Sequence, residues 1–348
     1  MENIHTCDPF LELMDRPAFL VKDGIVVQAN PAAQQKMIIT GEPITRFITK
    51  DLDAYQDFRD GCLCLQLDLG ASVFPANVID LEDKHLFVLD EHTDLKLKTF
   101  SLVAQQLRLP LHSALMASEV LSDEQDSGLL NQSLSRLHRI ICNMADIAKY
   151  QQGHSFMPES TDLNSLFSEI MEKAANLVSA AHIDLRYSAL PQSLMGFADR
   201  QMIERAVLNL VSNAIKFSPA GSAIEAKLTR KGSMLHFTVH DGGRGIPPEL
   251  RSSVFLRYLR EPTIEECTYG LGLGLSLVHA VAVNHGGTVL IDYPNGGGTR
   301  VTMTIDLRPK DSSILRSPVR YPTVDYSGGF DHTLLELSDV LPTDMYNK

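Results

Sequence analysis

The sequence lacks any long apolar run. No stretch of about 18 consecutive apolar residues occurs, which is the length that a membrane-spanning helix needs. Its first residues, MENIHTCDPFLELMDRP, are acidic and show no basic segment followed by an apolar one, so no signal peptide is predicted. We therefore expect a cytoplasmic protein with no membrane span.

Basic charge is also scarce. The 348 residues include 31 Lys and Arg against 43 Asp and Glu, a formal net charge of −12 at pH 7. A general nucleic-acid surface must neutralise phosphates with basic side chains, so no nucleic-acid partner is expected. With 44% hydrophobic and 21% charged residues, the composition is that of a globular chain of about two domains or several small ones.

Cysteine is sparse and scattered. Of the five cysteines only Cys62 and Cys64 are close together, and no second pair completes the spacing of a zinc site. A disulfide framework is not expected in a chain of this length with so few cysteines. The thiols are therefore predicted to be reduced, as in the cytosol.

The first part of the chain, residues 1–90, has the pattern of a small α+β unit. Alternating and β-branched residues predict strands around 18–28, 71–79 and 84–89. Between them, Asn30-Pro31 is typical of a helix start with proline in the first turn.

Residues 91–153 are expected to form a helical hairpin. A helix over 92–121 has apolar residues spaced by three and four, and Pro110 should kink it. The polar stretch 122–128 should break this pattern before a second helix. The second helix has a heptad seam of Leu134, Leu137, Ile141, Met144 and Ala148. Because such a hairpin cannot bury both seams alone, we expect two chains to form a four-helix bundle.

Residues 154–308 are expected to form an α/β domain. Two helices, near 162–181 and 198–217, alternate with strands. The strands are predicted near 183–188, 223–229, 234–240, 288–292 and 300–306. Residues 309–348 are punctuated by prolines and are expected to be a mostly unstructured tail. One amphipathic stretch in this tail, 334–341, could dock as a helix.

Three motifs follow one another in the α/β region. The first is Asn209-Leu-Val-Ser-Asn213-Ala-Ile-Lys216-Phe217, whose asparagines are four apart and therefore share one helix face. An amide oxygen is a hard ligand that suits a magnesium ion shared with nucleotide phosphates, and Lys216 could reach a phosphate. Taken alone, the motif also fits a polar stripe on a surface helix.

The second and third motifs are rich in glycine. Residues 241–246 (Asp-Gly-Gly-Arg-Gly-Ile) follow an apolar strand, and their glycines allow the backbone to approach a flat ligand closely. The carboxylate there could accept a hydrogen bond from an adenine amino group. Residues 270–275 (Gly-Leu-Gly-Leu-Gly-Leu) open an apolar helix whose first amides favour phosphate. They do not fit the dinucleotide fingerprint, because no strand directly precedes them.

Together and in this order, the motifs resemble the ATP-binding domain of sensor histidine kinases and of the wider superfamily of gyrase, the Hsp90 chaperone and mismatch-repair proteins. The resemblance covers about 155–308, and residues 254–260 resemble the phenylalanine box of the lid. It implies an α/β sandwich that binds Mg-ATP, with magnesium at Asn213 and adenine at Asp241. The other residues that it implies at the nucleotide are Asn209, Lys216, Gly243, Gly245, Phe255, Arg257, Arg260, Gly270, Gly272, Gly274 and Thr299.

Asn209 indicates the branch of this superfamily. In the gyrase-type hydrolases, a glutamate stands four residues before the magnesium asparagine and activates water. Here that position holds Asn209, and an amide cannot take a proton from water. ATP hydrolysis by that route is therefore not expected, whereas asparagine at this position is what the kinase branch implies.

Residues 105–111, Gln-Gln-Leu-Arg-Leu-Pro-Leu, resemble the phosphoacceptor box of the kinases, His-Glu-Leu-Arg-Thr-Pro-Leu. Residues 9–90 resemble a PAS sensor domain on fewer residues. The nucleophilic histidine of the family aligns with Gln105, whose amide nitrogen has no free lone pair to attack a γ-phosphate. The adjacent acid aligns with Gln106, which cannot accept the proton. Autophosphorylation at this position is therefore not expected.

Other histidines are poor substitutes for the missing nucleophile. His112 lies two turns after Gln105, and we expect it and His138 to face solvent. His240 is expected to be a strand-end residue. Three mechanisms stay open: a pseudokinase that binds ATP as a conformational ligand, a kinase that phosphorylates a histidine of another chain, and a kinase that uses His112 or another residue of its own. Two other functions are kept as alternatives: a phosphatase, and a non-enzymatic ATP-dependent binding module of the anti-sigma type. The expected partners are a second copy or another kinase, and a response-regulator protein.

Overall fold

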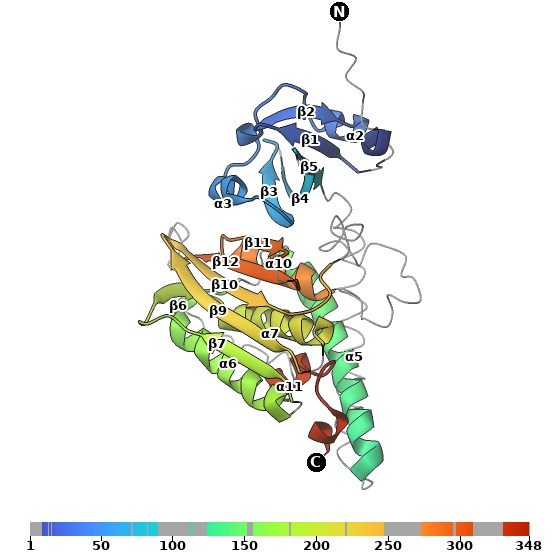
Figure 1. Ribbon diagram of the computed structural model, residues 1–348, viewed down its shortest axis with the longest axis vertical. Helices are drawn as coiled ribbons and strands as arrows, with labels where there is room; N and C mark the ends of the chain where they lie inside the picture. Colours follow the sequence, from blue (N-terminus) through green and yellow to red (C-terminus); the bar gives the residue numbers. More distant parts are fainter. Residues whose placement is uncertain are drawn as a thin grey trace, which may run out of the picture.

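The computed structural model describes the chain in several stretches. These are 9–89, 111, 114, 124–151, 156–246, 273–308 and 330–347, without residues 13, 15, 71, 82, 181, 220 and 295–296. The fold is mixed α/β, as expected: an N-terminal sheet, a larger sheet covered by helices, and one long helix beside the latter (Figure 1). No helix in these stretches combines the length and the apolar character that a bilayer crossing needs.

The N-terminal part is an antiparallel sheet in the order β2-β1-β5-β4-β3. Its strands are β1 (Ala18–Lys22), β2 (Ile25–Ala29), β3 (Cys62–Asp68), β4 (Val73–Leu81) and β5 (Lys84–Leu89). The short helix α1 (Pro9–Glu12) precedes the sheet, and three more connect β2 to β3: α2 (Pro31–Gln35), η1 (Ile44–Arg46) and α3 (Leu52–Asp57). Strand β3 was not predicted, because four consecutive residues from Cys62 to Leu65 are buried and no alternation reveals the strand.

The predicted helix start at Asn30-Pro31 is confirmed. The buried side chain of Asn30 accepts hydrogen bonds through Oδ1 from Ala33 N at 2.9 Å and from Ala18 N at 3.0 Å. One amide therefore caps α2 and ties it to β1. Pro31 occupies the first turn of α2, where a missing N–H leaves no bond unmade.

The larger part contains the two helices and five strands that were predicted, together with a third helix after the glycine motif. The helices are α6 (Leu163–Ala180), α7 (Arg200–Phe217) and α10 (Leu273–Asn284). The strands are β7 (Asp184–Ser188), β9 (Ala223–Lys231), β10 (Met234–His240), β11 (Val289–Asp292) and β12 (Arg300–Asp306). The helices cover one face of the sheet (Figure 1), and a small second sheet, β6 (Glu159–Asp162) with β8 (Met195–Ala198), was not predicted.

The two parts share one hydrogen-bonded sheet of ten strands. Strand β3 pairs antiparallel with β11, with Leu63 opposite Leu290. The hydroxyl of Thr288 donates to the carbonyl oxygen of Cys64, and Cys64 Sγ lies 3.1 Å from Nε2 of His279. Burial lowers the pKa of His279 to about 4.

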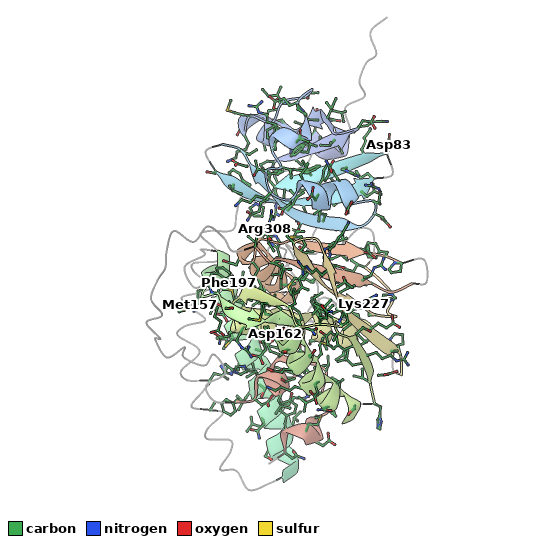
Figure 2. All side chains as sticks on the ribbon, turned by 90° about the vertical axis from the view of Figure 1, so that its left-hand side faces the viewer. Asp83, Met157, Asp162, Phe197, Lys227 and Arg308 are labelled. Atoms are coloured by element: carbon green, nitrogen blue, oxygen red, sulfur yellow. The ribbon has the colours of Figure 1, made fainter. Side chains whose placement is uncertain are left out.

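Further contacts reinforce this junction. An ion pair joins Lys231 of the larger part to Asp57 of α3. Arg308, after the end of β12, lies near the same boundary (Figure 2). Gly61 precedes β3 with φ +97°, and a Cβ there would come within 2.0 Å of the carbonyl oxygen of Ile291. The two backbones therefore approach so closely that only glycine fits.

Helix α5 (Glu124–Gln151) is the second helix of the expected hairpin. The predicted break at 122–128 is wrong for residues 124–128, which are helical. Glycine is unfavourable inside a helix. At Gly128 it allows a close contact, because a Cβ there would come within 1.8 Å of the side chain of Asn347. This packing of the C-terminal end of the chain outweighs the low helix propensity of glycine. The structure describes only 111 and 114 of the first hairpin helix.

The heptad seam of α5 is only partly buried. Leu134, Ile141 and Met144 cluster with Leu111, whereas Leu137 is 50% exposed. The expectation that His138 faces solvent is wrong, since its exposed fraction is 1%. Helix α5 is covered on a second side by α10 and by the C-terminal end of the chain, and its buried surface is therefore wider than one seam.

Residues 330–347 pack against α5 and α7. They contain α11 (His332–Glu336) and a 3-10 turn, η3 (Thr343–Tyr346). The expectation of a mostly unstructured tail is therefore wrong for this stretch, while 309–329 lies outside the described residues. The apolar side chains of 330–347 pack against other parts of the chain, and the local sequence of the tail does not encode these contacts. The helix of the amphipathic stretch ends at Glu336, earlier than 341.

Candidate functional site

Helix α7 carries the first of the three motifs. Its start is fixed by Asp199, whose carboxylate accepts a hydrogen bond from Met202 N at 3.1 Å. Most of the helix is buried, including three polar residues, Arg205, Asn209 and Ser212. Buried polar groups need partners, so these residues mark where other parts of the chain reach the helix.

Asn209 has no exposed surface. Its Nδ2 donates to the carbonyl oxygen of Arg205 at 2.9 Å and to Oε2 of Glu336 at 3.1 Å. Its Oδ1 accepts a hydrogen bond from Nη2 of Arg139 at 3.1 Å. Both N–H groups of this amide are therefore engaged within the protein, whereas Asn213, one turn later, is only partly buried.

Gly274, in the first turn of α10, lies against both asparagines. A Cβ at this position would come within 3.0 Å of Asn209 Oδ1 and 3.3 Å of Asn213 Nδ2. The start of α10 is thereby held beside the amide groups, and its N-terminal N–H groups carry the positive end of the helix dipole. The first and third motifs thus meet at one place in the fold.

Asp241, the first residue of the second motif, is 7% exposed and follows β10 directly. Its Oδ1 accepts hydrogen bonds from Gly243 N at 2.8 Å and Thr299 N at 3.1 Å, and its own N–H donates to Thr299 O at 3.0 Å. Burial raises the pKa of this carboxyl, although the two backbone donors act in the opposite direction. Since both bonds fall on Oδ1, Oδ2 takes part in neither.

Two glycines at the corner after β10 have no room for a side chain. A Cβ on Gly243 would come within 2.4 Å of the carbonyl oxygen of Phe217, and one on Gly298 within 1.8 Å of the carbonyl oxygen of Asp241. Gly245 and Gly298 have φ of +72° and +82°, in the region that favours glycine. The corner therefore packs on the end of α7, the helix that carries the asparagines.

The remaining predicted residues divide into two groups. Lys216, in the last turn of α7, has its Nζ 3.9 Å from Oδ2 of Asp339. His240 ends β10 as predicted, with Nε2 3.4 Å from Gly297 O. The others lie outside the described residues: Gln105, Gln106, His112, Phe255, Arg257, Arg260, Gly270 and Gly272.

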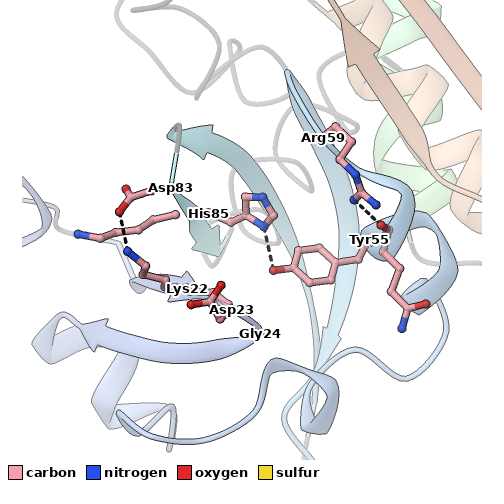
Figure 3. A pocket seen from close by; sticks show the side chains of 10 residues that line it. Lys22, Asp23, Gly24, Tyr55, Arg59, Asp83 and His85 are labelled. Carbon is pink, nitrogen blue, oxygen red and sulfur yellow. Dashed lines mark hydrogen bonds and ion pairs between the residues drawn. The ribbon is translucent and has the colours of Figure 1, made fainter.

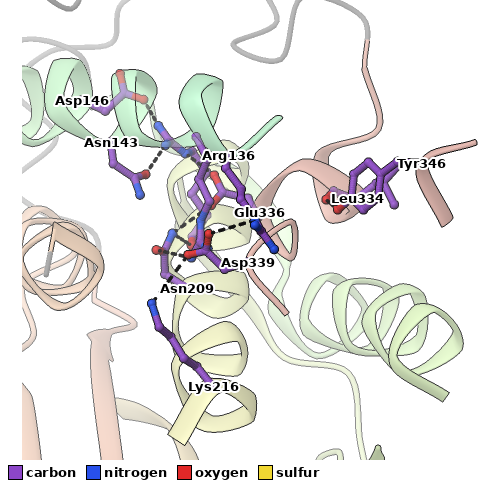
Figure 4. Close-up of polar contacts among 11 residues, drawn as sticks. Arg136, Asn143, Asp146, Asn209, Lys216, Leu334, Glu336, Asp339 and Tyr346 are labelled. Atoms are coloured by element: carbon purple, nitrogen blue, oxygen red, sulfur yellow. Dashed lines mark hydrogen bonds and ion pairs between the residues drawn. The ribbon is translucent and has the colours of Figure 1, made fainter. Parts of the chain in front are cut away.

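A buried ionic network beside Asn209 was not predicted (Figure 4). The carboxylate of Glu336 has no exposed surface and lies 3.0 Å from Nε of Arg205 and 3.1 Å from Nε of Arg139. Arg205 also pairs with Asp146 of α5. The only sequence signal is that Arg205 stands one turn before Asn209 on α7, because its partners come from distant parts of the chain.

A separate hollow of about 510 Å³ lies in the N-terminal part (Figure 3). Two of its charged groups form an ion pair, with Lys22 Nζ 2.8 Å from Asp83 Oδ2. The hydroxyl of Tyr55 lies 2.9 Å from Nδ1 of His85, and burial raises the pKa of Tyr55 to about 12 and lowers that of His85. Since these four polar groups are already engaged with one another, we assign no ligand to this hollow.

Comparison with known proteins agrees with the geometry of the larger part. Residues 198–309 match the family model of the histidine kinase-, DNA gyrase B-, and HSP90-like ATPase. The sensor-like histidine kinase SenX3 of Mycobacterium tuberculosis is 31% identical over 214 residues, which cover 58% of this chain and 52% of the relative. The chain thus matches only about half the length of SenX3.

Two further proteins are similar over different shares of the chain. The adaptive-response sensory kinase SasA of Parasynechococcus marenigrum is 25% identical over 309 residues, 83% of this chain and 79% of the relative. The crystal structure of full-length ShkA in complex with AMPPNP has a TM-score of 0.49 and 21% identity, covering 61% of this chain and 47% of ShkA. The chain is thus similar in sequence to sensor histidine kinases, and its residues 198–309 match the ATPase-type domain model.

Proposed function

We propose that the chain binds Mg-ATP between α7, the corner after β10 and the start of α10. The observation that supports this most directly is the position of Gly274, which brings the positive end of α10 beside Asn209 and Asn213. Asp241 and Thr299 lie beside Gly243, which packs on Phe217 at the C-terminal end of α7, one turn after Asn213. The arrangement offers separate places for phosphates and for a base.

The residues divide their roles by chemistry. The amide oxygen of Asn213 would hold Mg²⁺ together with phosphate oxygens. Oδ2 of Asp241 would accept a hydrogen bond from the adenine amino group, since its Oδ1 is already used by the backbone. Asn209 and Lys216 would assist at the phosphates. By resemblance, the lid residues Phe255, Arg257, Arg260, Gly270 and Gly272 would close over the nucleotide.

In the whole chain, we assign residues 1–90 to a PAS-like sensor domain and 91–153 to a dimerising hairpin. The five-stranded antiparallel sheet, with its short helices between β2 and β3, supports the first assignment. Exposed apolar residues on α5 support the second, because a partner helix would cover them: Leu129, Leu130 and Leu137. A response-regulator protein is the expected partner in two-component signalling.

We also propose that this homologue does not phosphorylate itself at position 105. Gln105 and Gln106 supply neither a nucleophile nor a base. ATP would then act as a conformational ligand of a pseudokinase. The alternative is a kinase that transfers phosphate to a histidine of a partner chain. A labelling experiment distinguishes this kinase from the pseudokinase.

Calorimetric titration with Mg²⁺ and a non-hydrolysable ATP analogue tests the binding site. The wild type is expected to bind and Asp241→Ala to lose binding. Asp292→Ala, which removes a surface partner of Arg300, is the matched control and should bind normally. The proposal is contradicted if the wild type does not bind and the double variant Glu336→Gln with Asp339→Asn does not bind either.

Radiolabelled ATP then tests phosphotransfer. The wild type should remain unlabelled, whereas Gln105→His combined with Gln106→Glu should acquire acid-labile label. Label on position 105 of the wild type would refute the pseudokinase proposal, and label on an added partner would favour the kinase that acts in trans.

A further inference from the structure

Residues 330–347 are docked on α5 and α7 through specific contacts. Four apolar side chains are buried: Leu335, Leu337, Leu341 and Tyr346. Nε2 of Gln132 in α5 donates to the carbonyl oxygens of Leu341 at 2.6 Å and Ser338 at 3.3 Å. Nδ2 of Asn131 donates to the carbonyl oxygen of Tyr346 at 3.1 Å. The segment is therefore a packed part of the fold.

This docked segment presents two carboxylates to the first motif. Glu336 and Asp339 are three residues apart and point to the same side (Figure 4). Glu336 Oε2 accepts a hydrogen bond from Nδ2 of Asn209 at 3.1 Å, and Asp339 Oδ2 lies 3.9 Å from Nζ of Lys216. Both contacted residues belong to the set that the proposed function assigns to the phosphates.

We infer that the segment 330–347 is an intramolecular competitor of the nucleotide, with Glu336 and Asp339 in the place of its phosphates. This inference rests on the proposed function. Nucleotide binding and docking of the segment exclude one another, because both need the donors of Asn209 and Lys216.

Accessibility is the first reason for this exclusion. Asn209 has no exposed surface while the segment is docked, and both of its N–H groups are engaged. A phosphate can reach this amide only after Glu336 withdraws. The apparent dissociation constant for the nucleotide is then the intrinsic one divided by the fraction of undocked protein.

Charge is the second reason. Four cations surround the two carboxylates: Arg136, Arg139, Arg205 and Lys216. A triphosphate carries several negative charges and could satisfy cations of this group instead. If the docked segment and a triphosphate were bound together, the carboxylates of Glu336 and Asp339 would lie beside the negatively charged phosphates. Repulsion between these charges at a largely buried site would raise the free energy of such a complex.

The test uses the full chain with Glu336→Gln and Asp339→Asn combined. These changes keep the side-chain shapes and remove both charges. Affinity for the Mg-bound ATP analogue should rise by at least about tenfold, as expected if a tenth or less of the wild type is undocked. Asp344→Asn is the matched control, because Asp344 is an exposed carboxylate of the same segment and should leave the affinity unchanged.

Hydrogen exchange of the wild type provides a readout that needs no variant. Saturation with the nucleotide should increase exchange at the amides of 331–347. If wild type and double variant bind equally well, or if exchange in the segment does not change on binding, the inference is wrong while the proposed function stands. If neither protein binds, the proposed function fails and the inference fails with it; binding by the double variant alone would support both.

Discussion

Gly243 lies directly against the carbonyl oxygen of Phe217, where a Cβ would approach within 2.4 Å. Its neighbour Gly242 is different, because the nearest atom to a Cβ there is 3.9 Å away, on Ser222. Two adjacent glycines of the same motif therefore differ sharply in the space around them. The difference makes them a matched pair for mutation.

We predict that Gly243→Ala weakens binding of the ATP analogue by about ten- to a hundredfold. The added methyl forces the corner away from α7, at a cost of about 1–3 kcal/mol that falls on the site. Gly242→Ala should bind within about threefold of the wild type. Titration calorimetry of both variants decides the matter, and equal losses in the two would show that the close approach to Phe217 is unimportant.

Arg205→Met should destabilise the protein by about 3 kcal/mol or more. Arg205 and Glu336 are both fully buried, so the change leaves a carboxylate without one of its partners in the interior. Arg200→Met on the same helix is the control: Arg200 is 47% exposed, and its loss should cost less than about 1 kcal/mol. The chain has no tryptophan, so urea unfolding would be followed by circular dichroism.

Acid should weaken the protein partly through His279. The unfolded imidazole takes up a proton near pH 6.5, but burial lowers the pKa of the folded one to about 4. The folded state therefore binds fewer protons between these values, and the free energy of unfolding falls as the pH falls, by about 3 kcal/mol at pH 4 from this residue.

His279→Gln should flatten that dependence between pH 6.5 and 4. His182→Asn, at an exposed position, should leave it as in the wild type. The measurement is urea unfolding at several pH values, compared as slopes. Parallel curves for wild type and His279→Gln would contradict the role assigned to this histidine.

Gly61→Ala should loosen the junction between the two parts of the protein. Its Cβ would meet the backbone of Ile291, whereas a Cβ on Gly70 would meet nothing within 4 Å. Both glycines have positive φ, +97° and +82°, so Gly70→Ala controls for backbone strain. Hydrogen exchange at the amides of β11 should rise in Gly61→Ala alone; an equal rise in both variants would mean that strain, and not the contact, causes the effect.

Local patterns predicted the larger part well. Apart from β8, which was not predicted, the helices and strands from 162 to 306 lie where the sequence pattern placed them, because alternation and helical periodicity are strong there. The spacing of Asn209 and Asn213 also predicted that they share one face of a helix, and Gly274 lies against both. Glycines at tight approaches explain this success, since their neighbours are fixed by the backbone.

Long-range contacts were not predictable in this way. The pairing of β3 with β11 and the ion pairs of Glu336 join residues that are more than a hundred positions apart, and no periodicity encodes them. The helical start of α5, where Gly128 packs against Asn347, depends on the same kind of contact. Tertiary packing decided these features against the local preferences of the chain.

The β3–β11 ladder has a mechanical consequence. A linker between two domains would let each turn freely, but a shared ladder transmits twist and shear from one sheet directly into the other. Strands β3, β11, β12 and β10 are paired in succession, so we expect a shift of β3 to move β10 and with it Asp241, which directly follows β10. The continuous sheet therefore connects the N-terminal strands to the corner at Asp241 that would bind the base.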